Sequence, residues 1–378
     1  MSRYDFLVVG AGLAGATFAR AAAEAGRRVL VMERRGHVAG NCHTPEREGI
    51  LVHQHGPHLF HTSSRAVWEW VTRFAAFVPY RHRALSRVGD RLYSFPINLL
   101  TLYQLWGVTT PAEAAARLAQ ERIPCERPRN LEEWALSQVG REIYETFFAG
   151  YTAKQWGRDP ADLPASLVRR LPVRLTHDDS YFPDRDVYQG VPAGGYTAMV
   201  EAMLDAPGVE VQLSVDFLEE RSRAEALAGQ VVYTGSLDSL GGHRQGYLGY
   251  RSLRFEHTVL EGDFQGAGQV NYPARDVPWT RITEHKHLGQ SSAGRGGVSG
   301  ERTVITREYP QSYDGDNEPY YPLADAENRA RAARYRADAE AQGYLLLGRL
   351  ARYQYMDMDV VVGQSLAVAS RLLGRTGF

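Results

Sequence analysis

The chain has 378 residues, only two of them cysteine, and a formal net charge of −1 at pH 7. A chain of this length exceeds the roughly 250–300 residues at which one hydrophobic core stops growing, so we expect two or three domains. The charge balance provides no global field that favours nucleic acid or an anionic membrane, and Cys42 and Cys125 fit no metal-ligand spacing. These properties indicate a globular, cytoplasmic protein that binds any phosphate group through individually placed cations.

The first 33 residues have the pattern of a β-α-β unit. Residues 4–9 are a short apolar run, residues 13–25 are rich in alanine, and residues 28–33 are a second apolar run. Glycines interrupt the apolar sequence directly after the first run, so we interpret this run as a strand. A signal peptide or a membrane-spanning segment would need a longer apolar stretch.

A glycine-rich motif connects the first strand to the helix. Gly10-Ala11-Gly12-Leu13-Ala14-Gly15 fits G-x-G-x-x-G, in which small residues let the backbone approach a pyrophosphate at the helix N-terminus. Glu33 ends the second strand, at the distance where an acid hydrogen-bonds a ribose hydroxyl, and Arg34 and Arg35 follow it. Gly348-Arg349-Leu350 resembles the second flavin contact of such folds, so the combination favours FAD over NAD.

Further elements are predicted along the rest of the chain. Apolar runs between 168 and 325 indicate a mostly antiparallel sheet, and residues 288–300 read as one loop. Asn130 followed by Glu133 is typical of a helix N-cap. We predict helices within 65–75, 100–150, 326–342 and 360–373, and extended segments at 92–96, 209–215, 231–233, 303–306 and 344–347.

Several segments combine aromatic residues with Arg, His and Asn, as a ligand with a base, a diphosphate and a sugar would require. Aromatic faces stack on a base, arginine makes bidentate hydrogen bonds to phosphate oxygens, and tyrosine hydroxyls bind the remaining phosphate oxygens without adding charge. Any one of these aromatics could instead belong to the core, and a single arginine could be a solvated surface charge.

Together these segments resemble the motif set of the bacterial UDP-galactopyranose mutase family, in the same order and over essentially the whole chain. The segments are GPHLFHT, GYTAKQWG, RRLPVR, YF followed by QGVPAGGY, YTG, TRITEHKH, EPYYP and GRLARYQYMDMD. The resemblance implies a mixed α/β fold in which a Rossmann-like FAD-binding domain accompanies an inserted helical domain and a twisted antiparallel β-sheet domain. The implied parts are residues 1–65, 190–240 and 340–378 for FAD, residues 100–165 for the helical lid domain, and residues 66–99, 166–189 and 241–339 for the sheet and connecting segments.

The resemblance also implies an activity and its partners. The family interconverts UDP-galactopyranose and UDP-galactofuranose without net oxidation, through attack of the N5 atom of reduced FAD on the anomeric carbon, for galactofuranose-containing cell-surface glycans. It implies FAD as the cofactor and a homodimer, and NAD(P)H is the external reductant that we expect. It implies no metal, no nucleic-acid partner and no membrane partner.

Roles carry over from the family to matching positions. Arg170 and Arg281 match the arginines that grip the diphosphate, and His58 and His61 match histidines near the isoalloxazine, so these four are the implied catalytic residues. The implied substrate contacts are Phe147, Phe148, Tyr151, Trp156, Tyr181, Phe182, Asn271, Tyr321, Tyr355 and His82. The implied cofactor contacts are Gly10, Gly12, Leu13, Ala14, Gly15, Glu33, Arg34, Gly40, Asn41, His58, Gly348, Arg349, Tyr355, Asp357 and Met358.

Three departures from the family pattern accompany the match. Ala39 stands where a glycine is expected, residues 181–189 are two residues longer, and the loop at 288–300 is long. His82 stands where some relatives have asparagine, and a surface histidine is an equal alternative. The other readings of the chain are a flavin amine oxidase or dehydrogenase, which shares the N-terminal motif and the late flavin contact, and a non-catalytic nucleotide-sugar or flavin-binding module.

Overall fold

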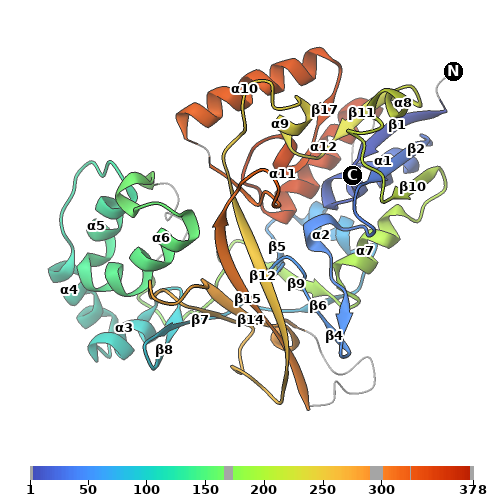
Figure 1. Cartoon of the computed structure of the whole chain (residues 1–378). Coiled ribbons are helices and arrows are strands. Elements are labelled where there is room, and N and C mark those ends of the chain that lie inside the picture. The colour runs from blue at the N-terminus through green and yellow to red at the C-terminus, as the bar shows by residue number, and fades with distance from the viewer. Residues whose placement is uncertain (1–2, 166–172, 290–300, 324, 375–378) are drawn as a thin grey trace.

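A five-stranded parallel sheet is built around the first strand of the chain (Figure 1). The computed structural model describes residues 3–165, 173–289, 301–323 and 325–374. The strand order is β10 (Val209–Leu213), β2 (Val29–Glu33), β1 (Tyr4–Val9), β11 (Ala228–Tyr233) and β17 (Leu345–Leu346). Val8 packs into the core on one face of this sheet, whereas Leu7 and Val9 pack into the core on the other. Both faces are therefore covered, as parallel sheets require.

Helices cover the first of these faces. α1 (Leu13–Glu24) packs against α7 (Gly195–Leu204) and α12 (Met358–Leu373), and its alanines allow close contact with both neighbours. The predicted strand, helix and strand at the N-terminus are confirmed. The expectation of an antiparallel sheet for 168–325 is wrong for β10 and β11, because both strands pair in parallel within this sheet. A short apolar run does not encode which partner strand it will meet.

A second sheet of seven strands separates the parallel sheet from a helical region (Figure 1). Its neighbours pair in antiparallel fashion, except that β13 and β7 run parallel. The order is β16 (Tyr321–Pro322), β12 (Tyr250–Glu261), β15 (Arg302–Ser312), β14 (Arg281–Glu284), β13 (Gln269–Asn271), β7 (Ala84–Val88) and β8 (Arg91–Phe95).

The helical region follows β8 and has its own core. It contains α3 (Leu99–Trp106), α4 (Pro111–Glu121), α5 (Leu131–Ile143), a π-helical turn (Tyr144–Ala149), α6 (Gly150–Trp156) and a 3-10 turn (Pro160–Asp162). The predicted cap is confirmed, because the Asn130 side chain accepts a 2.8 Å hydrogen bond from the Glu133 amide. Such caps satisfy amide groups that the first turn leaves without a partner.

Smaller elements complete the fold. A three-stranded sheet has the order β5 (Phe60–Thr62), β9 (Tyr188–Pro192) and β6 (Phe77–Pro79), and it packs against α12 and α7. The remaining elements are β3 (Glu46–Arg47), β4 (Ile50–Leu51), α2 (Arg65–Thr72), α8 (Arg221–Glu225), α9 (Leu237–Leu240), α10 (Ala326–Ala341), α11 (Gly348–Ala351) and the 3-10 turns Gly40–Cys42 and His285–His287.

The other predicted helices and strands are also present, with ends that differ by a few residues. Most of the predicted loop at 288–300 lies outside the described residues. The boundaries of the three implied domains stay a prediction. Across the described part of the chain, no helix combines the length and the apolar character that crossing a membrane requires.

Candidate active site

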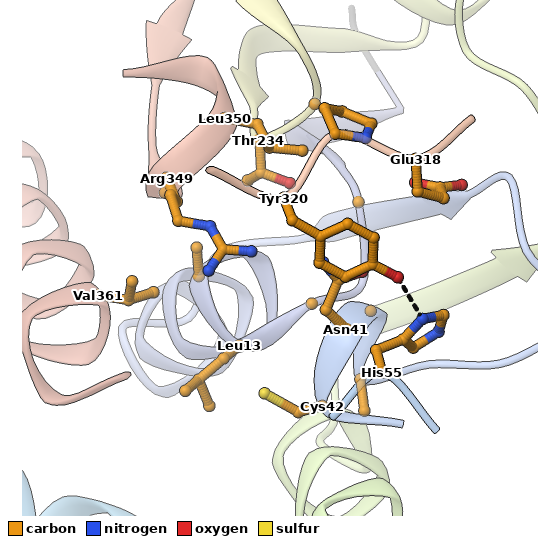
Figure 2. A pocket seen from close by; sticks show the side chains of 18 of the residues that line it. Leu13, Asn41, Cys42, His55, Thr234, Glu318, Tyr320, Arg349, Leu350 and Val361 are labelled. Carbon is orange, nitrogen blue, oxygen red and sulfur yellow. Dashed lines mark hydrogen bonds between the residues drawn. The ribbon is translucent and has the colours of Figure 1, made fainter. Parts of the chain in front are cut away.

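One cavity of about 570 Å³ extends from the glycine turn after β1 to side chains of the seven-stranded sheet. Its lining includes the ends of β1 and β2, residues 39–42, 55–61, 215–218, 233–236, 313–321 and 348–358. Figure 2 shows a part of its wall where these regions face one another. The carboxyl ends of the parallel strands lie at this cavity, which is where ligands bind in open α/β sheets.

In the glycine turn, backbone segments without side chains approach one another closely and leave their surface open to a ligand. Gly10 has φ +101°, and a Cβ atom on it would lie 2.2 Å from the Thr234 hydroxyl. A Cβ on Gly40 would lie 3.2 Å from the Cα atom of Gly12. Gly12 is the N-cap of α1 and provides no side-chain cap, so the first amides of this helix are available to an anion. This cradle fits the pyrophosphate of a dinucleotide.

Glu33 fixes the shape of the glycine turn. Its buried carboxylate accepts a 2.8 Å hydrogen bond from the Ala11 amide and a 2.9 Å hydrogen bond from the Arg35 amide. Because a carboxylate has about four acceptor positions, Glu33 can still accept a bond from a ribose hydroxyl in the cavity that it lines.

Ala39 occupies a position that favours glycine. Its φ of +74° lies in the left-handed region, and its amide donates a 2.9 Å hydrogen bond to the Ala11 carbonyl. A left-handed residue with a Cβ atom costs about 1–2 kcal/mol. The departure noted in the sequence is therefore tolerated by the backbone, at the cost of local strain, and it leaves the neighbouring Gly40 in the cavity wall.

Residues 313–321 form the wall opposite the glycine turn. Glu318 forms ion pairs with Arg34 and, at 2.9 Å, with Arg35. The Tyr320 hydroxyl and the Nδ1 atom of His55 share a 2.7 Å hydrogen bond (Figure 2). These contacts tie the wall to the ends of β2 and the 55–61 segment. Arg34 and Arg35 were identified from the sequence beside Glu33, but no sequence motif indicated that Glu318 pairs with them or that Tyr320 pairs with His55.

His58 is partly buried and has a defined tautomer. Its Nδ1 atom lies 2.8 Å from the Gly56 carbonyl oxygen, which can only accept, so Nδ1 carries the proton and Nε2 is an acceptor. The His53 Nδ1 atom accepts a 2.9 Å bond from the His58 amide. Burial lowers the pKa of His58 to about 4, so its imidazole is neutral near pH 7.

His82 lies at the end of the cavity that faces the seven-stranded sheet. Its side chain is buried, so the alternative of a surface histidine is wrong. Burial lowers the pKa of His82 to about 3. The ring lies 4.9 Å from the Tyr181 ring and 5.8 Å from the Phe182 ring. Despite the longer 181–189 stretch, both aromatic side chains line the cavity beside His82.

A buried ion pair brings positive charge to the same end. The Nε atom of Arg281 lies 3.3 Å from the Oε1 atom of Glu308, and Arg281 Nη2 donates a 2.9 Å hydrogen bond to the Tyr151 hydroxyl. Burial opposes the charge on Arg281, but the nearby Glu308 carboxylate raises the pKa of the guanidinium well above its usual value. Burial also raises the pKa of Glu308. Arg281 is thus a permanent cation in the cavity wall.

Two tyrosines complete this wall. The rings of Tyr321 and Tyr355 stack with centroids 6.0 Å apart, and the Arg349 guanidinium lies 5.9 Å from the Tyr321 ring centroid. Burial raises the pKa of Tyr321, so its hydroxyl stays protonated and can donate to an anion. Arg281 and these hydroxyls make this end of the cavity suited to phosphate oxygens.

The structure places most of the implied site residues on this one cavity. Arg170 lies outside the described residues. Gly15 packs α1 against the glycine turn, because a Cβ atom on it would lie 2.0 Å from the Gly10 carbonyl oxygen. The lining residues named from the sequence are Gly10, Gly12, Leu13, Ala14, Glu33, Arg34, Gly40, Asn41, His58, His61, His82, Tyr181, Phe182, Arg281, Tyr321, Gly348, Arg349, Tyr355, Asp357 and Met358.

Five implied contacts lie beside the cavity. Phe147 and Phe148 pack in the core of the helical region, and Trp156 packs against that core with its ring 6.4 Å from the Tyr321 ring. Tyr151 reaches the cavity through its bond with Arg281. Asn271 accepts a 2.9 Å bond from Gln269, and Gln269 itself lines the wall. Gln269 and Glu308 were not identified as site residues from the sequence, because neither lies in one of the quoted family segments.

The fold and this cavity define a dinucleotide-binding α/β protein. The end of its site opposite the glycine turn is lined by a cation and by aromatic side chains. A sequence profile described as an NAD(P)-binding Rossmann-like domain matches residues 8–74, and one described as UDP-galactopyranose mutase matches residues 146–355. The second match covers more than half of the chain. The chain belongs to the UDP-galactopyranose mutase family.

Individual relatives agree with this assignment. The chain is 38% identical to a probable UDP-galactopyranose mutase of Klebsiella pneumoniae, over 99% of this chain and 96% of the relative. It is 36% identical to a dTDP-fucopyranose mutase of Escherichia coli, over 96% of this chain and 97% of the relative.

Solved structures share the fold at low sequence identity. A crystal structure of reduced UDP-galactopyranose mutase matches with a TM-score of 0.74 and 15% identity, over 99% of this chain and 94% of the other. A putrescine oxidase variant matches with a TM-score of 0.58 and 14% identity, over 98% and 99% of the two chains. The fold by itself therefore does not separate a mutase from an amine oxidase.

Proposed function

We propose that this chain binds FAD and interconverts UDP-galactopyranose and UDP-galactofuranose without net oxidation. The observation that supports this most is the position of Arg281, Tyr321 and Tyr355 in the same cavity as the glycine cradle. A cation beside two phenol hydroxyls fits a diphosphate, and the glycine cradle in the same cavity fits the pyrophosphate of the cofactor.

The cofactor would be held by the chain's own backbone and acids. The amides at the start of α1 and the bare turn at Gly10 and Gly12 would face the pyrophosphate, and Glu33 would accept a bond from the ribose. Reduced FAD would supply the nucleophilic N5 that attacks the anomeric carbon of the sugar. NAD(P)H is the external reductant that we propose.

The substrate would lie at the other end. Arg281 would stabilise the negative charge that develops on the departing UDP, a contribution on the order of 3 kcal/mol for one well-placed donor. Arg170, outside the described residues, would serve the same phosphates. Phe147, Phe148, Tyr151 and Trp156 would hold the uracil and the sugar from the helical region. We also propose a cytoplasmic homodimer that serves galactofuranose-containing surface glycans.

A flavin amine oxidase is the competing function, because its fold is shared. It would leave the buried Arg281 and the adjacent tyrosines without a role, since an amine substrate is itself a cation. The identity of the sugar nucleotide also has to be tested, because one relative is named a dTDP-fucopyranose mutase.

Chromatography of reaction products distinguishes these functions. Dithionite-reduced, FAD-loaded protein is incubated in parallel with UDP-galactofuranose and dTDP-fucofuranose, and oxidised protein with putrescine. We expect conversion of UDP-galactofuranose to UDP-galactopyranose with the highest kcat/KM. Faster conversion of the dTDP-sugar would change the substrate, and oxidation of the amine without any sugar conversion would overturn the proposal.

A further inference from the structure

His61 and Asp186 form a close pair at the cavity although they are far apart in the sequence. The His61 Nδ1 atom lies 2.7 Å from the Asp186 Oδ2 atom. An ionised carboxylate can only accept a hydrogen bond, so Nδ1 is the donor, and in the neutral form of the ring the lone pair is on Nε2. His61 itself lines the cavity.

The strand pairing explains how the pair forms. His61 is the middle residue of β5 and is paired with Gln189 of β9, while its neighbours Phe60 and Thr62 are fully buried. Side chains alternate along a strand, so the His61 ring points away from those two residues and toward the cavity side. Asp186 precedes β9, whose first residue, Tyr188, pairs with Thr62, the residue after His61.

The turn before β9 directs the aspartate inward. The Asp186 amide donates a 2.9 Å hydrogen bond to the Pro183 carbonyl, and the Gln189 side chain donates a 2.8 Å bond to the Asp186 carbonyl. Asp186 is buried, whereas Asp184 in the same turn is exposed. This is the stretch that is two residues longer than the family pattern, so its extra length is used to build a turn that presents a carboxylate to His61.

The ring of His61 is also restrained from its face. Phe182 stacks on it with centroids 3.7 Å apart and an interplanar angle of 16°. Other charged or titratable groups nearby are Arg185, whose Nε lies 3.8 Å from Asp186 Oδ1, and His82, whose ring lies 5.8 Å from that of Phe182. The remaining cavity histidines bond to neutral groups, namely Gly56, Tyr80 and Tyr320.

We propose that Asp186 is a positioning residue that holds His61 in the Nδ1–H tautomer, so that Nε2 exchanges a proton with the substrate sugar. This inference rests on the proposed function. Opening a pyranose ring leaves the ring oxygen O5 in need of a proton, and closing the furanose ring removes one proton from O4. The proton that the flavin nitrogen would release on bonding to the anomeric carbon would pass to His61 Nε2, which would donate it to the ring oxygen as the first ring opens. When the other ring closes, Nε2 would take the proton of the attacking hydroxyl and return it to the flavin nitrogen as UDP rebinds the sugar, so no proton is gained or lost.

Kinetics of Asp186→Ala and of Asp184→Ala, its exposed neighbour in the same turn, test this role. We expect Asp186→Ala to lower kcat about 10- to 100-fold while KM and the Kd for UDP change less than twofold. The solvent deuterium isotope effect on kcat should increase, because proton transfer becomes more rate-limiting. Asp184→Ala should behave as the wild type, and Asp186→Glu should recover part of the lost rate. An Asp186→Ala variant with unchanged kcat would overturn the proposal.

A second measurement reads the tautomer without any turnover. Nitrogen-15 NMR of histidine-labelled, FAD-loaded protein identifies the His61 signals by their loss in His61→Gln. We expect a protonated Nδ1 in the wild type and a shift toward Nε2–H in Asp186→Ala. An unchanged tautomer would show that Asp186 does not position the ring. If the wild type fails to convert UDP-galactofuranose, the proposed function fails, while this measurement still decides the positioning role.

Discussion

Arg281 stands between Glu308 and Tyr151, with its Nε 3.3 Å from the Glu308 carboxylate and its Nη2 hydrogen-bonded to the Tyr151 hydroxyl. The Nε and Oε1 atoms are near enough to attract each other but are not aligned as a hydrogen bond. The pair therefore holds the guanidinium in the wall and leaves it able to bind an incoming anion.

Replacement of Arg281 should affect catalysis and stability separately. Arg281→Leu should lower kcat about 100- to 1,000-fold, because it removes a donor that stabilises developing charge. It should also reduce the free energy of unfolding by roughly 1–3 kcal/mol, because Glu308 is left buried without its cation. Steady-state kinetics and urea unfolding measure the two effects.

The double variant Arg281→Leu/Glu308→Gln separates these effects. It should regain most of the lost stability, because the amide carries no charge, but none of the lost activity. A double variant that is as unstable as Arg281→Leu would contradict the ion-pair explanation.

Gly12 tests the pyrophosphate cradle. A Cβ atom on Gly12 meets nothing closer than the Gly40 Cα at 3.9 Å, so Gly12→Ala should fold normally. Its methyl group would enter the space where the backbone approaches the pyrophosphate, so the Kd for FAD should rise at least tenfold. Gly36→Ala is the matched control, because its Cβ also has room, with Ser214 Oγ at 3.6 Å, and Gly36 lies outside the cavity lining. Equal FAD affinity of the two variants would argue against the cradle.

Acid should unfold this protein through its buried histidines. Burial lowers the pKa of His53 to about 3 and that of His82 to about 3, whereas the unfolded value is about 6.5. Below pH 6.5 the unfolded state therefore binds more protons, so this contribution to stability is complete above that pH and is lost as the pH decreases toward 3. Each such histidine adds about 1.4 kcal/mol per pH unit to the slope.

Urea unfolding at a series of pH values measures this slope. His53→Gln should reduce it by about 1.4 kcal/mol per pH unit, since one proton fewer is taken up on unfolding. His177→Gln, at an exposed position, is the control substitution. The same slope in His53→Gln and in the wild type would rule His53 out as a source.

The contact between α6 and the seven-stranded sheet can be tested with the chain's two lysines, because Lys154 makes this contact and Lys286 serves as the control. Lys154 donates to three backbone carbonyls at 2.6–2.9 Å, those of Tyr272, Val277 and Trp279. Lys154→Met should cost about 2 kcal/mol of unfolding free energy, because these carbonyls lose a charged donor. Lys286 bonds the Gly262 carbonyl and the exposed Asp263 carboxylate. Lys286→Met should therefore reduce the free energy of unfolding by less than about 1 kcal/mol. Thermal or urea unfolding ranks the two variants, and equal losses of unfolding free energy would show that the three carbonyl contacts of Lys154 are not the more stabilising set.

Local signals made the N-terminal unit predictable. The glycine motif, the alanine-rich helix and Glu33 are consecutive, and each constrains the backbone next to it. The same holds for the cap at Asn130. The parallel pairing of β10 and β11 was missed, because hydrophobic runs show that a strand is buried but not which strand lies beside it.

Site residues that depend on distant pairing were also missed. Glu308 is opposite Arg281 only because β14 and β15 pair in one register, and Asp186 meets His61 only because β9 pairs with β5. Neither residue belongs to a motif. The extra length before β9 was visible in the sequence, but its effect depends on which way the turn faces, and that is decided by tertiary packing.

A redox-neutral reaction leaves the flavin reduced after every turnover, so counting turnovers per flavin under anaerobic conditions tests the proposed function. The protein is reduced with a stoichiometric amount of dithionite, UDP-galactofuranose is added in large excess, and the product and the flavin spectrum are followed together. We expect many moles of UDP-galactopyranose per mole of flavin while the spectrum stays that of reduced FAD, and no product from the oxidised protein. Reoxidation of the flavin in proportion to product, or equal rates from oxidised and reduced protein, would contradict it.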